Sequence, residues 1–171
     1  MKIRPEQEKD HKAIRELTFR AFQNEEEPDL VEAIRESEFY IPELSIVAES
    51  SGRIVGHIMF SRISVIGDEE ETEVLSLAPM SVEPDMQMKG IGKKLIEKGL
   101  AECRRLGHRI VIVIGHPDYY PRFGFRPARE SGFEVPFDVP DEAFMVIALD
   151  GDALDGQGGM VEFSPPFDGL I

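Results

Sequence analysis

The residues with the clearest chemical meaning form a glycine turn, Gln-Met-Lys-Gly-Ile-Gly-Lys, at positions 87–93. A short apolar run at 74–80 precedes it, and apolar residues recur at helical spacing from 91 to 106 after it. This pattern predicts a strand, a turn and an amphipathic helix. The first N–H groups of a helix have no intrahelical partner and carry partial positive charge, and glycines let the backbone approach a ligand closely. The turn is therefore predicted to bind phosphate.

Two common phosphate-binding patterns do not fit this turn. Lys94 stands where the Walker pattern needs Ser or Thr, and Leu95 stands at the third glycine of the dinucleotide pattern. The pattern Q-x-x-G-x-G does fit, and here the chain resembles the GNAT superfamily of N-acetyltransferases. In that family the loop holds the pyrophosphate of acetyl-coenzyme A. The resemblance implies this role for Gln87, Met88, Lys89, Gly90, Ile91, Gly92 and Lys93, and places Met80, Ser81 and Val82 beside the pantetheine arm.

A second motif follows at 110–125, Ile-Val-Ile-Val-Ile-Gly-His-Pro-Asp-Tyr-Tyr-Pro-Arg-Phe-Gly-Phe. Its five β-branched residues predict a strand buried on both faces. Members of the GNAT family often carry a tyrosine four residues before a Gly-Phe pair, and this tyrosine protonates the departing coenzyme A thiolate. Tyr120 has that spacing. The resemblance therefore implies a general acid here, and packing among the neighbouring aromatic rings is the structural alternative.

The acceptor amine must lose a proton before it attacks the thioester. Many GNAT members use a glutamate eleven residues before the Gln of the motif, and this chain has Ser76 there. Serine is not a base by itself, but it can orient a water. The other candidates are Glu73, Glu83 and His116, and the sequence does not choose among them. Backbone amides of Met80 and Val82 are candidates for polarising the thioester carbonyl.

Composition excludes several classes of function. The 171 residues carry a net charge of −14, which argues against general nucleic-acid binding. The segment from Gln87 to Arg109 contains seven Lys or Arg residues and only two acidic residues. The one basic segment of the chain therefore coincides with the predicted phosphate site. The sequence has no apolar run long enough to span a membrane and no apolar core of a signal peptide. Cys103 is predicted to be a buried hydrophobe. Because it is the only cysteine, no internal disulfide can form, and a reducing cytoplasm is expected. We expect no metal.

The remaining elements predict an α+β sandwich with a mixed, mostly antiparallel twisted sheet flanked by helices, as in the GNAT fold. A strand at 2–4, a helix capped by Asp10, a helix beginning at Pro28, a hairpin of strands 44–49 and 53–66, and late strands near 133–135 and 143–149 are expected. Residues 1–149 are predicted to form the catalytic domain. Residues 150–171 are predicted to be a Gly/Asp-rich linker and a tail that packs on the domain or a second subunit, which allows a homodimer.

These observations favour an N-acetyltransferase that transfers acetyl from acetyl-coenzyme A directly to a small-molecule or peptide amine. Three alternatives stay open: a catalytically silent coenzyme A-binding module, for which Ser76 is the supporting observation, a transferase for longer acyl chains, and a plain interaction domain whose glycine turn is only a helix cap.

Overall fold

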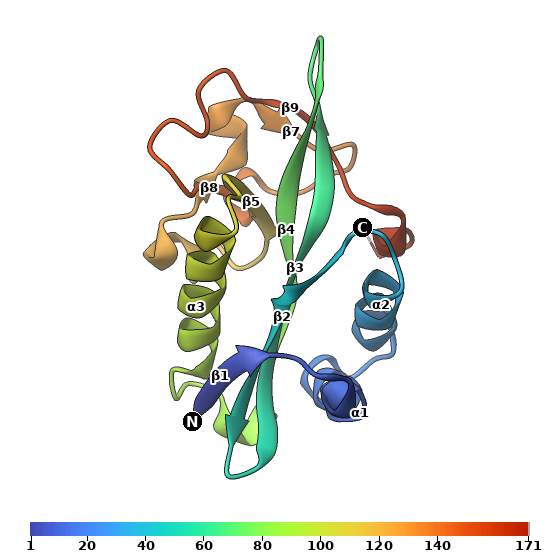
Figure 1. The fold of residues 1–171 in the computed structure, drawn as a ribbon. Coiled ribbons are helices and arrows are strands. Elements are labelled where there is room, and N and C mark those ends of the chain that lie inside the picture. Colours follow the sequence, from blue (N-terminus) through green and yellow to red (C-terminus); the bar gives the residue numbers. More distant parts are fainter. Residues whose placement is uncertain (171) are drawn as a thin grey trace. The chain divides into compact units, whose positions relative to one another are not determined.

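A mixed β-sheet organises the computed structural model, which describes residues 1–170 (Figure 1). Within that range the strands are β1 (Lys2–Pro5), β2 (Tyr40–Ser50), β3 (Arg53–Ile66), β4 (Glu71–Val82), β5 (Ile110–Ile114), β6 (Arg126–Pro127), β7 (Phe133–Glu134), β8 (Phe144–Ala148) and β9 (Gly159–Glu162). The α-helices are α1 (His11–Phe22), α2 (Glu26–Arg35) and α3 (Ile91–Arg105). The strand order is β1-β2-β3-β4-β5-β8-β6, and β9 pairs with β3 and β7. Among the strand pairs described for residues 1–170, β4 with β5 and β7 with β9 run parallel, and the others run antiparallel.

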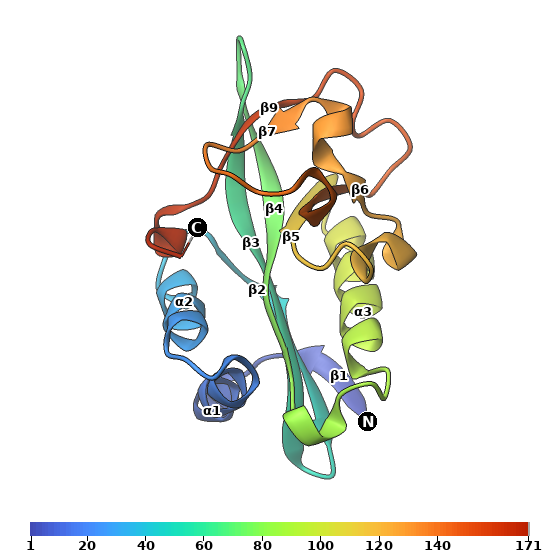
Figure 2. The same ribbon diagram turned by 180° about the vertical axis from the view of Figure 1, so that it is seen from behind.

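The chain divides into two compact units, each of which takes part of the long strands β3 and β4. The first unit comprises residues 1–61 and 78–102, and the second comprises residues 62–77 and those from 103 onward. In the first unit, α1 and α2 lie on one face of the sheet and α3 lies on the other, as the two opposite views show (Figures 1 and 2). This arrangement confirms the predicted flanked sheet for that unit.

Helix α3 packs closely on β3 because glycines remove side chains from the contact. A Cβ at Gly99 would lie 2.3 Å from Cε1 of Phe60, and one at Gly56 would lie 2.9 Å from side-chain carbons of both Ile91 and Leu95. The β2–β3 register also shifts beside Gly56, between its partner Ala48 and Glu49. The apolar stripe read from the sequence is therefore the buried face of α3.

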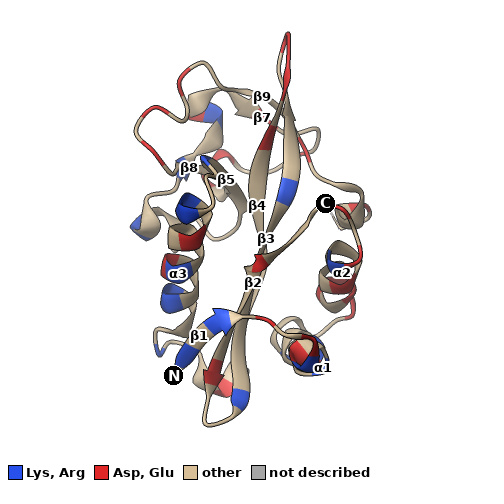
Figure 3. Ribbon diagram, viewed as in Figure 1, with Lys and Arg blue, Asp and Glu red and all other residues tan. Residues whose placement is uncertain are grey.

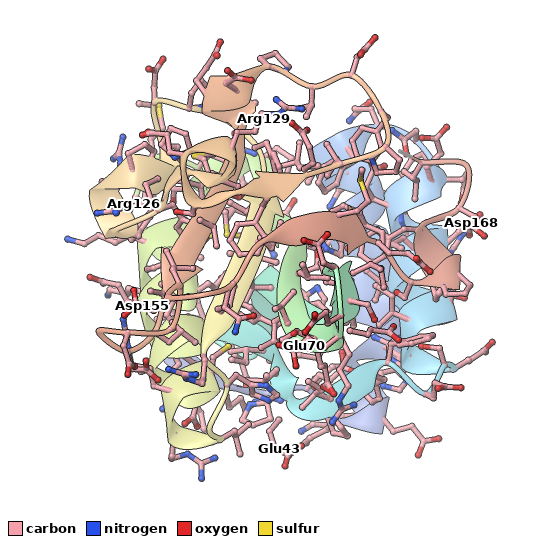
Figure 4. The ribbon with its side chains drawn as sticks, turned by 90° about the horizontal axis from the view of Figure 1, so that it is seen from above. Glu43, Glu70, Arg126, Arg129, Asp155 and Asp168 are labelled. Carbon is pink, nitrogen blue, oxygen red and sulfur yellow. The ribbon has the colours of Figure 1, made fainter. Side chains whose placement is uncertain are left out.

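In the second unit, β5 is central and fully apolar. It pairs in parallel with β4, where Ser76 lies opposite Ile112, and antiparallel with β8. Arg129, labelled in Figure 4, joins the turn Ala128–Ser131 to Glu134 and Asp141 through its guanidinium group, at 2.8 and 2.7 Å. Strand β9 pairs with the end of β3, with Ile66 opposite Met160.

Most predicted elements are present with small boundary differences. The prediction that the second helix begins at Pro28 was wrong by two residues, because α2 begins at Glu26. Proline is tolerated within the first turn, where N–H groups have no intrahelical partner. Strands β6 and β9 were not predicted. The predicted tail contributes β9 and the turn Pro165–Phe167, and Ile171 lies outside the described residues.

Candidate functional site

The glycine turn joins the end of β4 to α3 within the first unit. A 3₁₀ turn, Pro84–Met86, follows β4, and the backbone then adopts positive φ at Met88 (65°) and Gly90 (85°). A Cβ at Gly90 would meet no heavy atom within 4 Å, so the glycine is required by its conformation and not by lack of space. We call residues 84–93 the coenzyme loop, after the role that the resemblance implies for positions 87–93.

The end of α3 at this loop has the features of an anion site. Lys94 N–H donates to Gly90 O at 3.1 Å, which is the first bond of the helical ladder. The N–H groups that precede it in the first turn therefore have no intrahelical acceptor, and the helix dipole adds partial positive charge. Lys89, Lys93 and Lys94 are exposed here, and blue bands recur along α3 in Figure 3. The arrangement can hold a phosphate.

Glu83 lies between β4 and the coenzyme loop and is held by arginines. Its side chain is only 6% exposed. Nε and Nη2 of Arg20, on α1, donate to the two carboxylate oxygens at 2.9 and 2.8 Å, and Nη2 of Arg53 lies 3.5 Å from Oε2. The hydrogen bond from Arg20 keeps the pKa of Glu83 below its ordinary value. A carboxylate stabilised in this way is a weaker proton acceptor.

The other first-unit residues named from the resemblance have varied environments. Ser81 is buried, and its Oγ has no hydrogen-bond partner among the described residues. Met80 and Val82, on either side, are half-buried. The side chain of Gln87 donates to Val82 O at 3.3 Å, and Met88 is fully exposed.

Tyr120 belongs to the second unit, in the 3₁₀ turn Tyr120–Phe123 after β5. Its ring is 9% exposed, and a Cβ at Gly115 would lie 2.5 Å from it. Edge-to-face contacts with Tyr119 and Phe125, with centroids 5.3 and 5.7 Å apart, fix its orientation. Burial raises the pKa of Tyr120 to about 12. The phenol is therefore protonated at neutral pH, as a proton donor must be, but it is a weaker acid than an exposed tyrosine.

The second unit also holds three of the residues considered for deprotonating the amine. Glu73 is half-exposed and its Oε1 accepts from Nε of Arg62 at 2.9 Å. Ser76 is buried within β4. His116 is exposed after β5, and its carbonyl oxygen accepts the N–H of Tyr119 at 3.1 Å. The structure thus groups Glu73, Ser76, His116 and Tyr120 in one unit, and Met80–Val82, Glu83 and 87–93 in the other.

A buried polar cluster in the first unit was missed by the sequence reasoning. Glu6 accepts from Nε and Nη2 of Arg35 at 2.8 and 2.9 Å, and from the hydroxyls of Tyr40 and Ser45 at 2.6 Å each. Burial alone would raise the pKa of Glu6, but these donors outweigh it and lower the pKa to about 2. Ser45 Oγ lies 2.9 Å from Nε2 of His57, which is fully buried. The only sequence signal was a set of polar residues at inward strand positions.

Comparison with known proteins identifies the family. A model of the acetyltransferase (GNAT) domain matches residues 2–128. The uncharacterized N-acetyltransferase YjhQ of Escherichia coli K12 is 41% identical over 130 residues, which cover 75% of this chain and 72% of that protein. The chain belongs to the GNAT family of acetyltransferases.

Solved GNAT structures share the fold over nearly the whole chain. The E. coli protein YhbS, crystallised in complex with CoA, superposes with a TM-score of 0.90 at 30% identity, covering 98% of this chain and 91% of that one. A GNAT acetyltransferase from Brucella melitensis, in complex with acetyl-CoA, gives 0.80 at 33% identity, with 98% and 97% covered. The predicted GNAT fold is thereby confirmed. Among residues 1–170, none of the helices combines the length and the hydrophobicity that a membrane span requires.

Proposed function

We propose that this GNAT protein transfers an acetyl group from acetyl-coenzyme A to a primary amine on a small molecule or peptide. The observation that carries the proposal is the coenzyme loop, where a positive-φ glycine, first-turn N–H groups and exposed lysines meet at the N-terminus of α3. The crystallised relatives with CoA and acetyl-CoA support the same ligand. No group of three His, Cys, Asp or Glu side chains suited to a metal occurs among residues 1–170.

In this proposal, bound acetyl-coenzyme A supplies the thioester carbon that the amine attacks and the sulfur that leaves. Gln87 to Lys93 hold the pyrophosphate, and Met80, Ser81 and Val82 lie along the pantetheine arm. Backbone N–H groups of Met80 and Val82 stabilise the negative charge that develops on the carbonyl oxygen. The new C–N bond forms first, and Tyr120 donates its phenolic proton to the sulfur when the C–S bond breaks.

The proton of the amine goes to a group not yet assigned. Glu83 is the least suited candidate because Arg20 stabilises its ionised form and lowers its pKa. Glu73 and His116 remain, with Ser76 able to orient an intervening water. Replacing each of the first two by Gln and recording kcat/KM against pH tests them, because loss of the base removes the acidic limb of the profile.

The coenzyme site is tested by calorimetric titration with acetyl-coenzyme A. Gly90→Val and Gly107→Val form a matched pair, since both glycines have positive φ (85° and 88°) and open space around a Cβ, but only Gly90 lies in the coenzyme loop. We expect micromolar binding by the parent, at least tenfold weaker binding by Gly90→Val, and parental affinity for Gly107→Val. A parent protein that does not bind acetyl-coenzyme A would overturn the proposal.

A silent coenzyme-binding module is the second candidate, favoured by Ser76 in place of the usual glutamate. Coenzyme binding without thiol release across a panel of amines would support it.

We also propose that residues 1–149 form the catalytic domain and that residues 150–171 pack on this domain or on a second subunit, as they would in a homodimer. We propose that the protein acts in the cytoplasm.

A further inference from the structure

Glu83 is connected to three separate parts of the first unit. Its N–H donates to Val55 O on β3 at 2.9 Å, and its carbonyl oxygen accepts the N–H of Met86 at 2.8 Å. Its carboxylate meets the guanidinium fork of Arg20 on α1. The residue therefore links β3, the first turn of the coenzyme loop and α1.

The side-chain contact is the one of these three that depends on residue type. A bidentate fork fixes both the distance and the orientation of a carboxylate, which a single hydrogen bond does not do. Glu83 is 6% exposed while Arg20 is 46% exposed, so the acid is the buried partner. Loss of Arg20 would leave a buried charge with only the longer contact to Arg53, which also lies 3.7 Å from Asp85.

The coenzyme loop begins immediately after this anchor. Four residues separate Glu83 from Met88, where φ turns positive, and the side chain of Gln87 reaches back to Val82 O. Displacement of Glu83 would thus move the start of a turn whose amides must converge on one ligand. A binding site held by backbone amides tolerates such displacement poorly.

We propose that Arg20 is a positioning residue that sets the geometry of the coenzyme loop through Glu83. This inference rests on the proposed function of that loop. The Arg20–Glu83 pair differs from an ordinary stabilising ion pair in one consequence. Its removal weakens the affinity for acetyl-coenzyme A more than a similar loss of stability elsewhere in the protein does.

The test compares Arg20→Met with the matched control Arg35→Met. Both remove a bidentate arginine from a buried carboxylate in the same unit, and the partner of Arg35, Glu6, is 1% exposed. Acetyl-coenzyme A affinity is measured by calorimetry, thermal stability by Tm, and loop protection by amide hydrogen exchange at residues 85–90. We expect both variants to lower Tm. Only Arg20→Met should weaken affinity, by about 3- to 30-fold, and speed exchange in the loop.

Further variants keep the outcome decisive. If Arg20→Met fails to fold, Arg20→Lys retains the charge without the fork and should show a smaller loss of affinity; a parental affinity for it would overturn the inference. The double variant Arg20→Glu/Glu83→Arg, in which the two side chains are swapped, should recover part of the acetyl-coenzyme A affinity lost in either single variant. Equal affinity in parent and Arg20→Met, or equal losses in Arg20→Met and Arg35→Met, overturns the inference. A parent that does not bind acetyl-coenzyme A refutes the proposed function instead.

Discussion

Because His57 is buried, we expect the protein to lose stability in mildly acidic solution. Burial lowers its pKa to about 4, against an ordinary value of 6.5. The geometry agrees, because the hydroxyl of Ser45 donates to Glu6 and therefore accepts the proton on Nε2 of His57. A second proton would sit on Nδ1, which is buried and has no partner among the described residues. The charged or titratable groups that act on the His57 ring are Glu6, whose Oε1 lies 3.7 Å from Nε2, Arg35 and His11.

The sign of the effect follows from which state binds the proton first. Between about pH 6.5 and 4 the unfolded chain protonates this histidine and the folded chain does not, so stability falls as the pH falls. The full separation between the two pKa values corresponds to about 3 kcal/mol. Between pH 7.5 and 5.0 the loss should be about 2 kcal/mol. Paired carboxylates such as Glu6 contribute mainly below this window, because their stabilisation is lost only below about pH 4.5.

Urea unfolding at several pH values between 7.5 and 5.0 measures this loss. His57→Gln should be less stable at pH 7.5, and its stability should depend on pH less than that of the parent, because glutamine can place an N–H near Ser45 and does not titrate. Part of the slope should remain, because burial also lowers the pKa of His108. His116→Gln, which removes an exposed histidine, should keep the parental slope. The same slope in the parent and in His57→Gln would refute the reasoning.

Three further predictions concern the core and the reaction. Gly99→Ala should lower the free energy of unfolding, measured by urea titration, by about 1–3 kcal/mol, because the new Cβ would collide with Phe60. This loss is expected although alanine has the better helix propensity. The control Ala101→Gly, at an exposed position of the same helix, should lower the free energy of unfolding by only about 1 kcal/mol. Tyr120→Phe should keep acetyl-coenzyme A affinity and slow thiol release by about 10²- to 10⁴-fold, and an unchanged rate would exclude the acid role. Lys93→Gln should weaken acetyl-coenzyme A binding in calorimetry at low salt, by about 2- to 5-fold, with the difference shrinking at high salt.

The sequence predicted the elements whose signals are local. Helix α3 was found because its apolar residues repeat over four turns, and β5 because five β-branched residues are consecutive. The glycine turn was found because backbone conformation and residue type are tightly coupled at Gly90. These parts of the fold and of the candidate site could therefore be derived from short stretches of the chain.

The parts that were missed depend on distant partners. Strand β9 has four residues and begins with glycine, and it forms because the end of β3 offers an unpaired edge almost a hundred residues earlier. The ion pair of Arg20 with Glu83 joins positions 63 residues apart, so neither residue shows it locally. From the sequence alone, Glu83 looked like a free carboxylate beside the loop; its partner changes its expected chemistry.

The buried carboxylates Glu6 and Glu83 have the same structural role in the first unit. Glu6, which follows β1, receives Arg35 from α2, and Glu83, which follows β4, receives Arg20 from α1. Each pair therefore ties one helix to a strand end, with a defined orientation that apolar packing alone does not impose. A hydrophobic replacement of either pair could preserve stability while it releases the helix orientation. For Glu83 that orientation also sets where the coenzyme loop begins, so such a replacement should weaken acetyl-coenzyme A affinity at the Arg20–Glu83 pair and leave it unchanged at the Arg35–Glu6 pair.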